Sequence, residues 1–299
     1  MDNILSQMDN RDDVGIVLGD INAAILSDVE LMIISPGISI ESDIAEKVRE
    51  MNIPIWSEIE LAYRCGSGHL AAITGTNGKT TTTSLVGEIF KAYTDNSYTV
   101  GNIGIPYTDV ALELDEDSYI ALEVSSFQLE AVSDFHPHVS AVLNVTPDHL
   151  DRHHTMKNYI AAKMNIAKNQ NSENICILNY EDATLRECAE KLTPEVVWFS
   201  SKRELKDGLF YTDGRIWYAR NGVNTLVCET DRLLLIGTHN YENVMAAVAA
   251  AIYFKVPYDV IREALYTFKP VEHRIEYVAT KSGVKYYNDS KGTNPDRKS

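Results

Sequence analysis

Blocks of apolar and polar residues alternate over the first part of the chain. Residues 31–34 form an apolar run that predicts a buried strand, which ends at Ser35-Pro36-Gly37. Over residues 41–51 the apolar positions have helical spacing, and a strand at 53–56 and a helix at 57–63 follow. This strand–helix–strand–helix order predicts a parallel sheet.

A small, polar stretch at residues 65–69 predicts a linker to a second, larger domain. Beyond it we expect helices over 79–93, 157–167 and 182–192, and strands over 98–100, 119–123, 138–145, 175–178 and 196–199. This alternation predicts a doubly wound α/β fold with a mostly parallel sheet.

The pattern changes between residues 208 and 229 and again near the end of the chain. Short β-like runs at 215–218 and 225–228, separated by Asp-Gly and Asn-Gly, predict an antiparallel excursion. Amphipathic helices are expected over 241–254 and 259–268, where Pro270 ends the pattern, and strands over 274–279 and 284–287.

The pattern divides the chain into three predicted domains: residues 1–66, 67–270 and 271–299. Two strands without covering helices cannot form an independent core, so we expect the last domain to be cut short. We expect the first domain to be partial too, because its sheet has few strands and lacks a glycine-rich first turn.

Composition narrows the class of protein. A length of 299 residues favours more than one domain, and a net charge of −16 argues against a general nucleic-acid binder. The four cysteines have no zinc-like spacing, and no apolar run approaches the roughly 20 residues that span a bilayer. The start does not resemble a signal peptide, so we expect a cytoplasmic protein without membrane partners.

The most informative stretch runs from Ala72 to Thr81, where an apolar strand leads into a glycine-flanked turn and then a helix. Its residues Gly75, Thr76, Asn77, Gly78, Lys79, Thr80 and Thr81 predict a phosphate cradle of backbone N–H groups, with a lysine for phosphates and a threonine for magnesium. The common phosphate loop has a glycine five residues before Gly78, and Ile73 stands there instead. The alternative is a plain strand-to-helix turn, which the run of threonines disfavours because threonines open helices poorly.

Further candidates follow other predicted strands. Glu123 ends an apolar strand and is the candidate magnesium ligand, the alternative being a surface glutamate. The segment 144–154 brings Asp148, His149 and two more histidines into one loop, of which we expect one histidine to touch metal or substrate. Asn102, between Gly101 and Gly104, could offer its amide to a ligand, although a plain turn is the alternative.

Asn240 and Asn243 lie three residues apart at a predicted helix start and therefore share one face. The alternative is an N-cap role for Thr238 or Asn240.

Taken in order, these segments resemble the ATP-dependent Mur ligases of peptidoglycan synthesis, a resemblance that also covers His273-Arg274 and residues 289–294. Within that family, Ser35-Pro36-Gly37-Ile38, Ser125-Ser126-Phe127-Gln128-Leu129 and Asn288-Asp289-Ser290-Lys291 resemble the members that add D-glutamate. Relatives that add diaminopimelate or lysine would be expected to have histidine after Ser-Ser.

The resemblance implies three domains: one for the UDP moiety, a central P-loop ATPase and a carboxyl-terminal α/β domain. The chain resembles the back part of the first, a Rossmann-like remnant, all of the second, and the beginning of the third. It lacks the opening glycine-rich loop, and residues 296–299 depart from the family's continuation.

The resemblance also implies a reaction, in which ATP activates the carboxylate of UDP-N-acetylmuramoyl-L-alanine as an acyl phosphate that D-glutamate then attacks. It implies catalytic roles for Lys79, His149 and Lys163, and two magnesium ions, one held by Thr80 and Glu123 and one by His149 and a carbamylated Lys163. Without the resemblance, Lys163 would be taken for an exposed helix lysine.

Other roles follow from the same resemblance. Residues matching substrate positions are Ser35, Pro36, Gly37, Asn102, Ser125 and Gln128. Besides the loop 75–81, residues matching nucleotide positions are Asn240 and Asn243 for adenine, Arg274 for the phosphates and Asp289 for the ribose. Lys291, Thr293 and Asn294 match substrate-side positions near the third domain.

Two alternatives stay open at this point. A ligase like folylpolyglutamate synthetase shares the short loop and the carboxylate chemistry, but the Ser-Ser-Phe-Gln and Ser-Pro-Gly-Ile segments disfavour it. The chain could instead be a nucleotide-binding fragment without ligase activity. The expected assembly is a monomer with small-molecule partners only.

Overall fold

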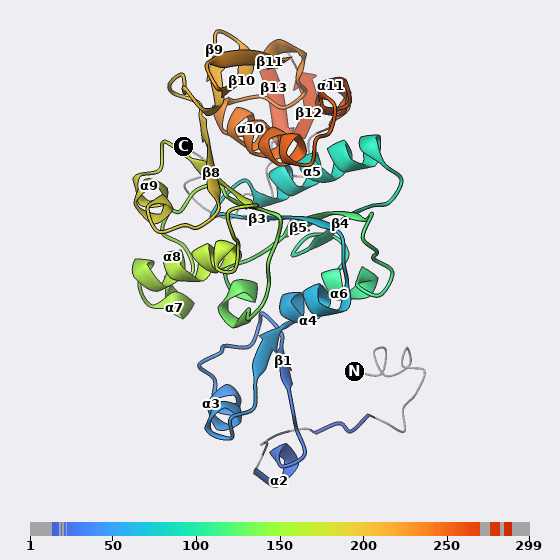
Figure 1. The fold of residues 1–299 in the computed structure, drawn as a ribbon, viewed down its shortest axis with the longest axis vertical. Helices are drawn as coiled ribbons and strands as arrows, with labels where there is room; N and C mark the ends of the chain where they lie inside the picture. Colours follow the sequence, from blue (N-terminus) through green and yellow to red (C-terminus); the bar gives the residue numbers. More distant parts are fainter. Residues whose placement is uncertain are drawn as a thin grey trace.

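The computed structural model describes residues 14–17, 19, 21, 23–269, 276–281 and 284–288. Figure 1 shows a small N-terminal unit below a larger body, in which helices cover both faces of a long sheet. The molecule is elongated along the axis that joins these parts.

The N-terminal unit has the predicted strand–helix–strand–helix order. Its elements are α2 (Ala23–Leu26), β1 (Met32–Ile34), α3 (Asp43–Glu50), β2 (Ile55–Ser57) and α4 (Glu58–Cys65). β1 and β2 pair in parallel, with Met32 opposite Ile55, which confirms the parallel arrangement. Ser57 ends β2 and caps α4 by accepting a hydrogen bond from the backbone N–H of Glu60 at 3.3 Å.

α4 is also fixed to the larger body through the fully buried carboxylate of Glu60. This carboxylate accepts hydrogen bonds from three consecutive backbone N–H groups, those of Ser133, Asp134 and Phe135, each at 2.9 Å. Because each of these backbone donors is satisfied, the turn at 133–135 can pack against the helix without leaving buried polar groups unpaired.

The larger body is built on a nine-stranded sheet with the order β11-β10-β9-β8-β7-β6-β3-β5-β4 among the described residues. Its strands are β3 (His69–Thr74), β4 (Ser97–Gly101), β5 (Tyr119–Glu123), β6 (Val139–Val142), β7 (Ile175–Asn179), β8 (Glu195–Ser200), β9 (Gly208–Thr212), β10 (Arg215–Arg220) and β11 (Val223–Glu229). Strands β3 to β9 pair in parallel, and β10 and β11 are antiparallel. The predicted mostly parallel α/β sheet is therefore confirmed.

Helices pack on both faces of this sheet, as Figure 1 shows. On one face are α5 (Lys79–Tyr93), α10 (Thr238–Tyr253) and α11 (Tyr258–Thr267). On the other are α4, α6 (Tyr107–Val110), α7 (Leu150–His153), α8 (Met156–Met164), α9 (Ala183–Ala189) and the short 3-10 helices Gln128–Ala131 and Asn165–Ala167. A third 3-10 helix, Thr230–Arg232, follows β11.

The central strand β3 shows how the sheet divides the interior. Ala71 and Ile73 point into one buried apolar cluster, whereas Leu70 and Ala72 point into the other. Alternate residues of a strand face opposite sides, so a strand that is apolar throughout indicates a sheet covered on both faces.

The antiparallel excursion at residues 208–229 is also confirmed. Both central residues of its two turns have positive φ, at 48° and 72° for Asp213-Gly214 and at 52° and 76° for Asn221-Gly222. These values are those of the turn type that matches the twist of a hairpin and favours Asn-Gly and Asp-Gly.

Element boundaries differ from the predictions at a few places. α4 runs to Cys65, inside the predicted linker, and α10 begins at Thr238 with Gly237 as its N-cap. The alternative N-cap role for Thr238 or Asn240 is therefore wrong, because Gly237, with φ of 99°, takes that position. β12 (Glu276–Lys281) and β13 (Val284–Asn288) form a separate antiparallel pair, and the boundaries at 66 and 270 stay predictions.

Candidate functional site

The candidate site lies at one edge of the sheet, where the parallel strands end. The loop 75–78 follows β3, Asn102 follows β4, Glu123 ends β5, and Asn144 comes after β6. Because β4, β5, β3 and β6 are neighbours in this order, their ends present these side chains side by side. Ligands of open α/β sheets bind at such an edge.

Two glycines shape the loop between β3 and α5. Gly75 has a φ of 152° and Gly78 a φ of 86°, and Gly78 is the N-cap of α5. A Cβ atom on Gly78 would lie 2.3 Å from the side-chain oxygen of Asn243 on α10. The loop therefore packs tightly against α10, and α5 directs the positive end of its dipole at the space beside the loop.

Asn144, at the end of the neighbouring strand, clamps the loop from its other side. Its Oδ1 accepts from the backbone N–H of Asn77 at 2.8 Å, and its Nδ2 donates to the Asn77 carbonyl at 3.1 Å. The backbone N–H of Thr76 donates to the Asn144 carbonyl at 3.0 Å. Sequence reasoning singled out the segment that contains Asn144 but not this clamp.

The Thr76 side chain fixes the loop to the segment that carries the histidines. Its hydroxyl accepts from the Thr146 backbone N–H at 3.0 Å and lies 3.1 Å from the hydroxyl of Tyr159 on α8. Tyr159 was also missed, since one aromatic residue on a helix gives no signal in the sequence.

Lys79 and Lys163 converge on the same carbonyl oxygen of the loop. Lys79 Nζ donates to Gly75 O at 2.8 Å and to Thr76 O at 3.0 Å, and Lys163 Nζ donates to Gly75 O at 2.9 Å. Lys163 is 2% exposed, so the alternative of an exposed helix lysine is wrong.

Burial lowers the pKa of Lys163 well below that of an ordinary lysine, and the charge of Lys79 adds to this effect while Asp148 opposes it. Desolvation and a neighbouring like charge both disfavour the ammonium form. Lys163, with a lowered pKa, therefore contacts the loop at the Gly75 carbonyl.

Glu123 is buried, at 2% exposure, which excludes the alternative of a surface glutamate. Its Oε1 accepts from Asn102 Nδ2 at 2.9 Å, whereas its buried Oε2 has no hydrogen-bond partner. A buried carboxylate oxygen without a partner is costly in a folded protein, and a bound cation would satisfy it.

A magnesium ion fits this set of donors. In the part of the chain that the structure describes, no three His, Cys, Asp or Glu side chains gather in a cluster that could hold a metal. Magnesium, however, keeps several waters and uses one or two carboxylates together with substrate phosphates. Glu123 and the hydroxyl of Thr80, in the first turn of α5, suit that mode of binding.

The three histidines in the segment 144–154 differ in their surroundings, and His149 is the candidate for a ligand. Its side chain is 50% exposed, and its ring centroid lies 5.0 Å from that of Phe127 and 6.5 Å from that of Tyr159. His153 is buried between Ser126 and Glu130, and exposed His154 contacts Glu41 at 2.9 Å. That one of these histidines touches metal or substrate stays a prediction.

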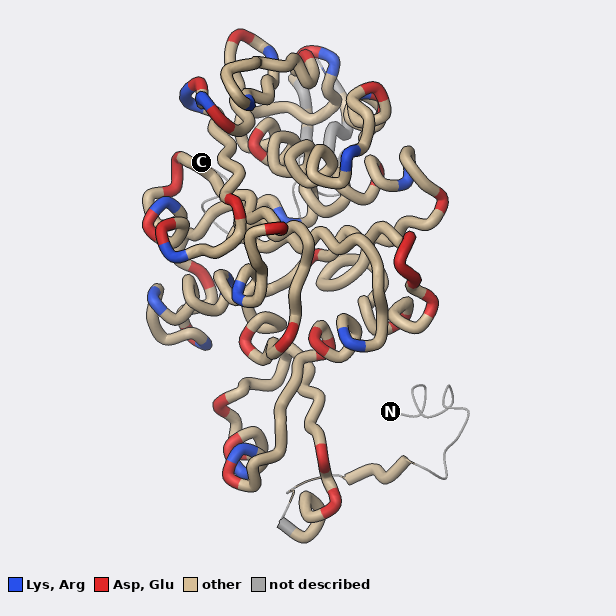
Figure 2. Tube along the Cα trace, viewed as in Figure 1, with Lys and Arg blue, Asp and Glu red and all other residues tan. Residues whose placement is uncertain are grey.

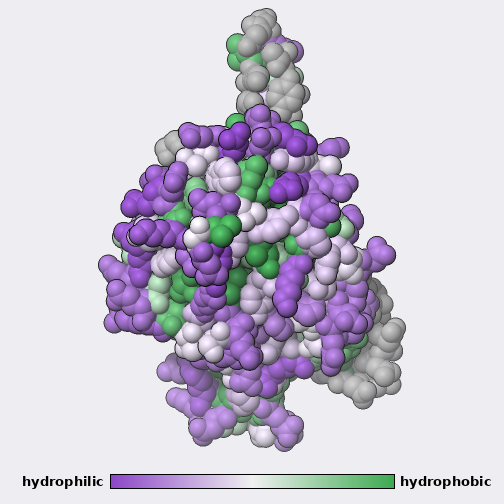
Figure 3. Space-filling view, turned by 45° about the horizontal axis from the view of Figure 1, so that its top comes forward, coloured by the Kyte–Doolittle hydropathy of each residue, from purple (hydrophilic) through white to green (hydrophobic). Residues whose placement is uncertain are grey.

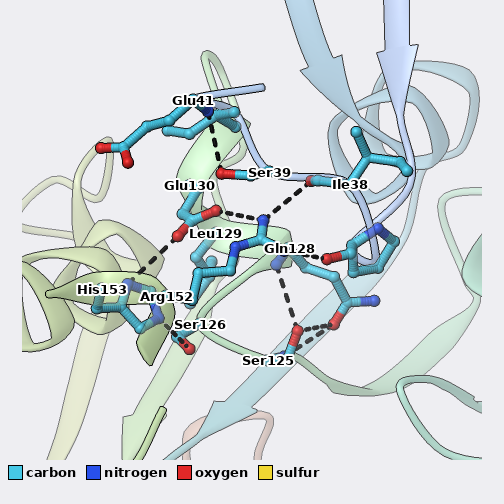
Figure 4. A network of polar contacts seen from close by, with 12 residues as sticks. Ile38, Ser39, Glu41, Ser125, Ser126, Gln128, Leu129, Glu130, Arg152 and His153 are labelled. Atoms are coloured by element: carbon cyan, nitrogen blue, oxygen red, sulfur yellow. Dashed lines mark hydrogen bonds and ion pairs between the residues drawn. The ribbon is translucent and has the colours of Figure 1, made fainter. Parts of the chain in front are cut away.

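The predicted substrate residues Ser125 and Gln128 are joined to each other. Gln128 Oε1 accepts from the backbone N–H of Ser125 at 2.8 Å and from its hydroxyl at 3.0 Å (Figure 4). Gln128 Nε2 donates to Glu58 at 2.7 Å. Glu58, in the first turn of α4, was not predicted as part of the site.

The predicted segment Ser35-Pro36-Gly37 reaches the same region through Arg152. The guanidinium of Arg152 donates to Pro36 O at 2.6 Å and to Ile38 O at 3.0 Å (Figure 4). The structure therefore brings the substrate residues predicted in the N-terminal unit next to α7, which follows His149.

Asn240 and Asn243 lie where α10 meets the loop. Asn240 Nδ2 donates to Ile236 O at 2.8 Å, Asn243 Nδ2 donates to Asn240 Oδ1 at 3.3 Å, and Thr82 donates to Asn243 Oδ1 at 3.3 Å. Thr81 is buried in the first turn of α5. Arg274, Asp289, Lys291, Thr293 and Asn294 lie outside the described residues.

The protein is acidic overall, and the face drawn in Figure 3 is mostly polar. Asp and Glu are spread along the chain in Figure 2, and the face drawn in Figure 3 is largely hydrophilic with apolar patches between. Against a net charge of −16, Lys79 supplies positive charge at the loop. None of the helices in the described ranges has the length and apolar character to cross a membrane.

Comparison with known proteins gives a consistent picture. The Mur ligase middle domain family matches residues 73–251. The UDP-N-acetylmuramoylalanine–D-glutamate ligase of Lachnoclostridium phytofermentans is 54% identical over 281 residues, covering 94% of this chain and 62% of that protein. The enzyme of the same name from Lachnospira eligens is 51% identical over 282 residues, with the same coverage of 94% and 62%.

Solved structures share the fold at lower identity. MurF from Acinetobacter baumannii superposes with a TM-score of 0.60 at 22% identity, covering 80% of this chain and 53% of that one. MurF from Thermotoga maritima in complex with ADP gives 0.58 at 17%, covering 91% and 71%. The chain spans 62% of the length of the first two curated relatives. Since the family match extends over more than half of its residues and its fold agrees, the chain belongs to the Mur ligase family.

Proposed function

We propose that the protein is an ATP-dependent ligase that joins D-glutamate to UDP-N-acetylmuramoyl-L-alanine in peptidoglycan precursor synthesis. One observation carries the proposal: Lys79 and Lys163 meet at Gly75 O beside Glu123, whose buried Oε2 has no partner. The names of relatives that are 54% and 51% identical supply the substrates.

A carboxylate is a poor electrophile, so it must be activated before an amine can attack it. A carboxylate oxygen attacks the γ-phosphorus of ATP, and the bond between this phosphorus and the β,γ-bridging oxygen breaks. ADP is the leaving group, and the product is an acyl phosphate. The amine of D-glutamate then attacks the carbonyl carbon, phosphate leaves and the amine loses a proton. Stabilising charge on the migrating phosphoryl group is the main task, and Lys79 and the N-terminal end of α5 would perform it.

Thr80 and Glu123 would hold one magnesium ion, and His149 with Lys163 a second. When bound, magnesium would neutralise charge on the phosphate oxygens. The unpartnered oxygen of Glu123 supports the first site, and the half-exposed ring of His149 supports the second.

Lys163 would serve the second site in a carbamylated form. A neutral amine is required: its nitrogen forms a bond to the carbon of CO2 and loses a proton, which converts a cation into an anionic oxygen ligand. The burial of Lys163 and the lowered pKa of its amine support this step.

Asn240 and Asn243 would face the adenine side of the nucleotide, since they adjoin the loop, and a solved Mur relative holds ADP. Ser35, Pro36, Gly37, Asn102, Ser125 and Gln128 would face the UDP-muramoyl substrate. A cytoplasmic monomer that uses only small-molecule partners fits these substrates.

The test measures ADP release with ATP, magnesium and UDP-N-acetylmuramoyl-L-alanine, with and without D-glutamate. We expect release to depend on D-glutamate and to fall about 100- to 1000-fold in Lys79→Ala. Lys91→Ala, an exposed lysine on the same helix, is the matched control and should retain the rate. Equal rates with L-glutamate and a folate acceptor would overturn the proposal.

A further inference from the structure

A polar network joins the N-terminal unit to the central sheet, and Arg152 stands at its centre (Figure 4). One of its terminal nitrogens donates to Pro36 O, and the other donates both to Ile38 O and to Glu130 Oε2, the last at 2.7 Å. The two carbonyls belong to the segment 35–38 of the N-terminal unit, whereas Arg152 belongs to α7. Arg152 therefore contacts Pro36, which lies 116 positions before it in the sequence, and Ile38, which lies 114 positions before it.

Phe127 and Glu130 fix the orientation of the Arg152 guanidinium. Its guanidinium lies 4.3 Å from the centroid of the Phe127 ring, and its partner Glu130 is 10% exposed. A planar guanidinium with several fixed partners loses little further freedom when it holds a backbone segment. The arrangement suits a rigid connection better than a mobile surface arginine.

The network continues to the turn that carries the candidate substrate residues. Glu130 Oε1 lies 3.3 Å from His153 Nδ1, and His153 Nε2 lies 2.9 Å from the hydroxyl of Ser126. Ser126 is the neighbour of Ser125, which Gln128 holds. The contacts thus run without a gap from residues 36–38 to the turn 125–128.

The charges in this network balance within it. Burial, followed by the charge of Arg152, lowers the pKa of His153 to about 4, so the imidazole is neutral at pH 7. Arg152 is then left with Glu130 as its partner and with two backbone carbonyls. Both terminal nitrogens of Arg152 donate to protein groups, while its Nε is buried without a hydrogen-bond partner. The terminal nitrogens therefore hold other residues rather than an anion.

We infer that Arg152 is a positioning residue for the UDP-muramoyl substrate, fixing the segment 35–38 in register with the turn 125–128. The inference rests on the proposed function, because the substrate is the one assigned there. Holding both halves of a binding surface in place beforehand lowers the ordering entropy lost when the ligand binds.

The first experiment measures hydrogen exchange at the backbone amides of Ser35, Gly37 and Ile38 without substrate. We expect Arg152→Ala to accelerate exchange in this segment. Arg152→Lys should have a smaller effect, because its ammonium can keep a bond to one carbonyl but cannot hold both as a guanidinium does. Unchanged exchange in Arg152→Ala would overturn the inference whatever the protein's activity.

The second experiment measures KM and kcat for each substrate. Arg152→Ala should raise the KM for UDP-N-acetylmuramoyl-L-alanine about 10- to 100-fold, the scale of one to two charge-assisted hydrogen bonds, and leave the KM for ATP within about threefold. Arg152→Lys should recover part of the loss. Lys157→Ala removes a nearby exposed lysine and is the control for charge.

An equal rise in both KM values, or the same rise in Lys157→Ala, would overturn the inference. Failure of the proposed function has a different signature: the wild-type protein would not turn over this substrate, although exchange at 35–38 would still respond to Arg152→Ala.

Discussion

At the scale of single residues, the site is defined by groups whose burial is unusual for their chemistry. Lys163 is 2% exposed and Glu123 is 2% exposed, although lysine and glutamate normally stay at the surface. Glu123 ends β5 at the same edge of the sheet as the loop 75–78, and Lys163 contacts the Gly75 carbonyl of that loop. Because burial alone destabilises such groups, they mark a candidate binding site.

The buried amine of Lys163 should make stability depend on pH. The unfolded chain binds a proton at an ordinary lysine pKa, while the folded pKa is lowered, so stability contributed by this group rises with pH up to the unfolded pKa. Lys163→Met should therefore exceed the wild type in free energy of unfolding at pH 7, by about 1–3 kcal/mol.

Urea unfolding at several pH values between 6.5 and 10, in buffers freed of carbon dioxide, checks this prediction. The gap between variant and wild type should narrow as the pH rises. A gap that stays constant would show that Lys163 is not buried as an amine.

Activity should respond to Lys163 in the opposite direction. Lys163→Ala should lose most of its ADP release, and added short carboxylates should restore part of it by supplying the anionic oxygen that a carbamylated Lys163 would give to the proposed second magnesium. The measurement is the rate with and without acetate or formate. An unchanged rate in the variant would remove Lys163 from the site.

Glu123→Gln tests the unpartnered oxygen. The amide retains an oxygen for Asn102 but removes the charge that would hold magnesium, so magnesium-dependent binding of a non-hydrolysable ATP analogue should weaken about 10- to 100-fold. Calorimetry with and without magnesium separates the metal from the nucleotide. If Glu123→Gln weakens binding of the ATP analogue equally without magnesium, Glu123 does not act as a magnesium ligand.

At the scale of elements, hydrophobic period and turn chemistry were sufficient to predict much of the fold. The helix 79–93 and the strand 119–123 were predicted with the bounds that the structure shows, because both have strong patterns and clear ends. The start of α10 was not predicted correctly. Its N-cap is Gly237, which has no side chain that would indicate a helix start in the sequence.

Contacts between elements were harder to foresee. Asn144 contacts Asn77 because the order of the strands brings their loops together. Arg152 contacts Pro36 because the N-terminal unit packs against α7. Both partners lie far away in the sequence. Local pattern carries no information about such pairings. The candidate residues could be named, but the clamp and the bridge that hold them could not.

The clamp formed by Asn144 can be tested by itself. Asn144→Ala removes two hydrogen bonds to Asn77 and should lower the free energy of unfolding by about 1–3 kcal/mol, while weakening ATP binding because the loop loses its support. Asn224→Ala, at an exposed position on β11, is the control. If Asn144→Ala binds ATP as the wild type does, the clamp does not shape the phosphate site.

At the scale of the whole molecule, the sheet brings together groups from distant parts of the sequence. The N-terminal unit approaches the edge through Arg152 and Glu58, the strands β3 to β6 supply the loop, carboxylate and amides, and α10 closes over the loop through Asn243. In this acidic protein, Lys79 supplies positive charge at the same edge.

The central claim is that this edge uses ATP to activate a carboxylate, and an isotope measurement tests it most directly. The substrate UDP-N-acetylmuramoyl-L-alanine, labelled with 18O in its carboxylate, is incubated with the protein, ATP, magnesium and D-glutamate, and the released phosphate is analysed by mass spectrometry. The acyl phosphate route predicts one 18O atom in the phosphate for each amide bond formed. Amide formation with unlabelled phosphate, or with AMP and pyrophosphate as products, would contradict it.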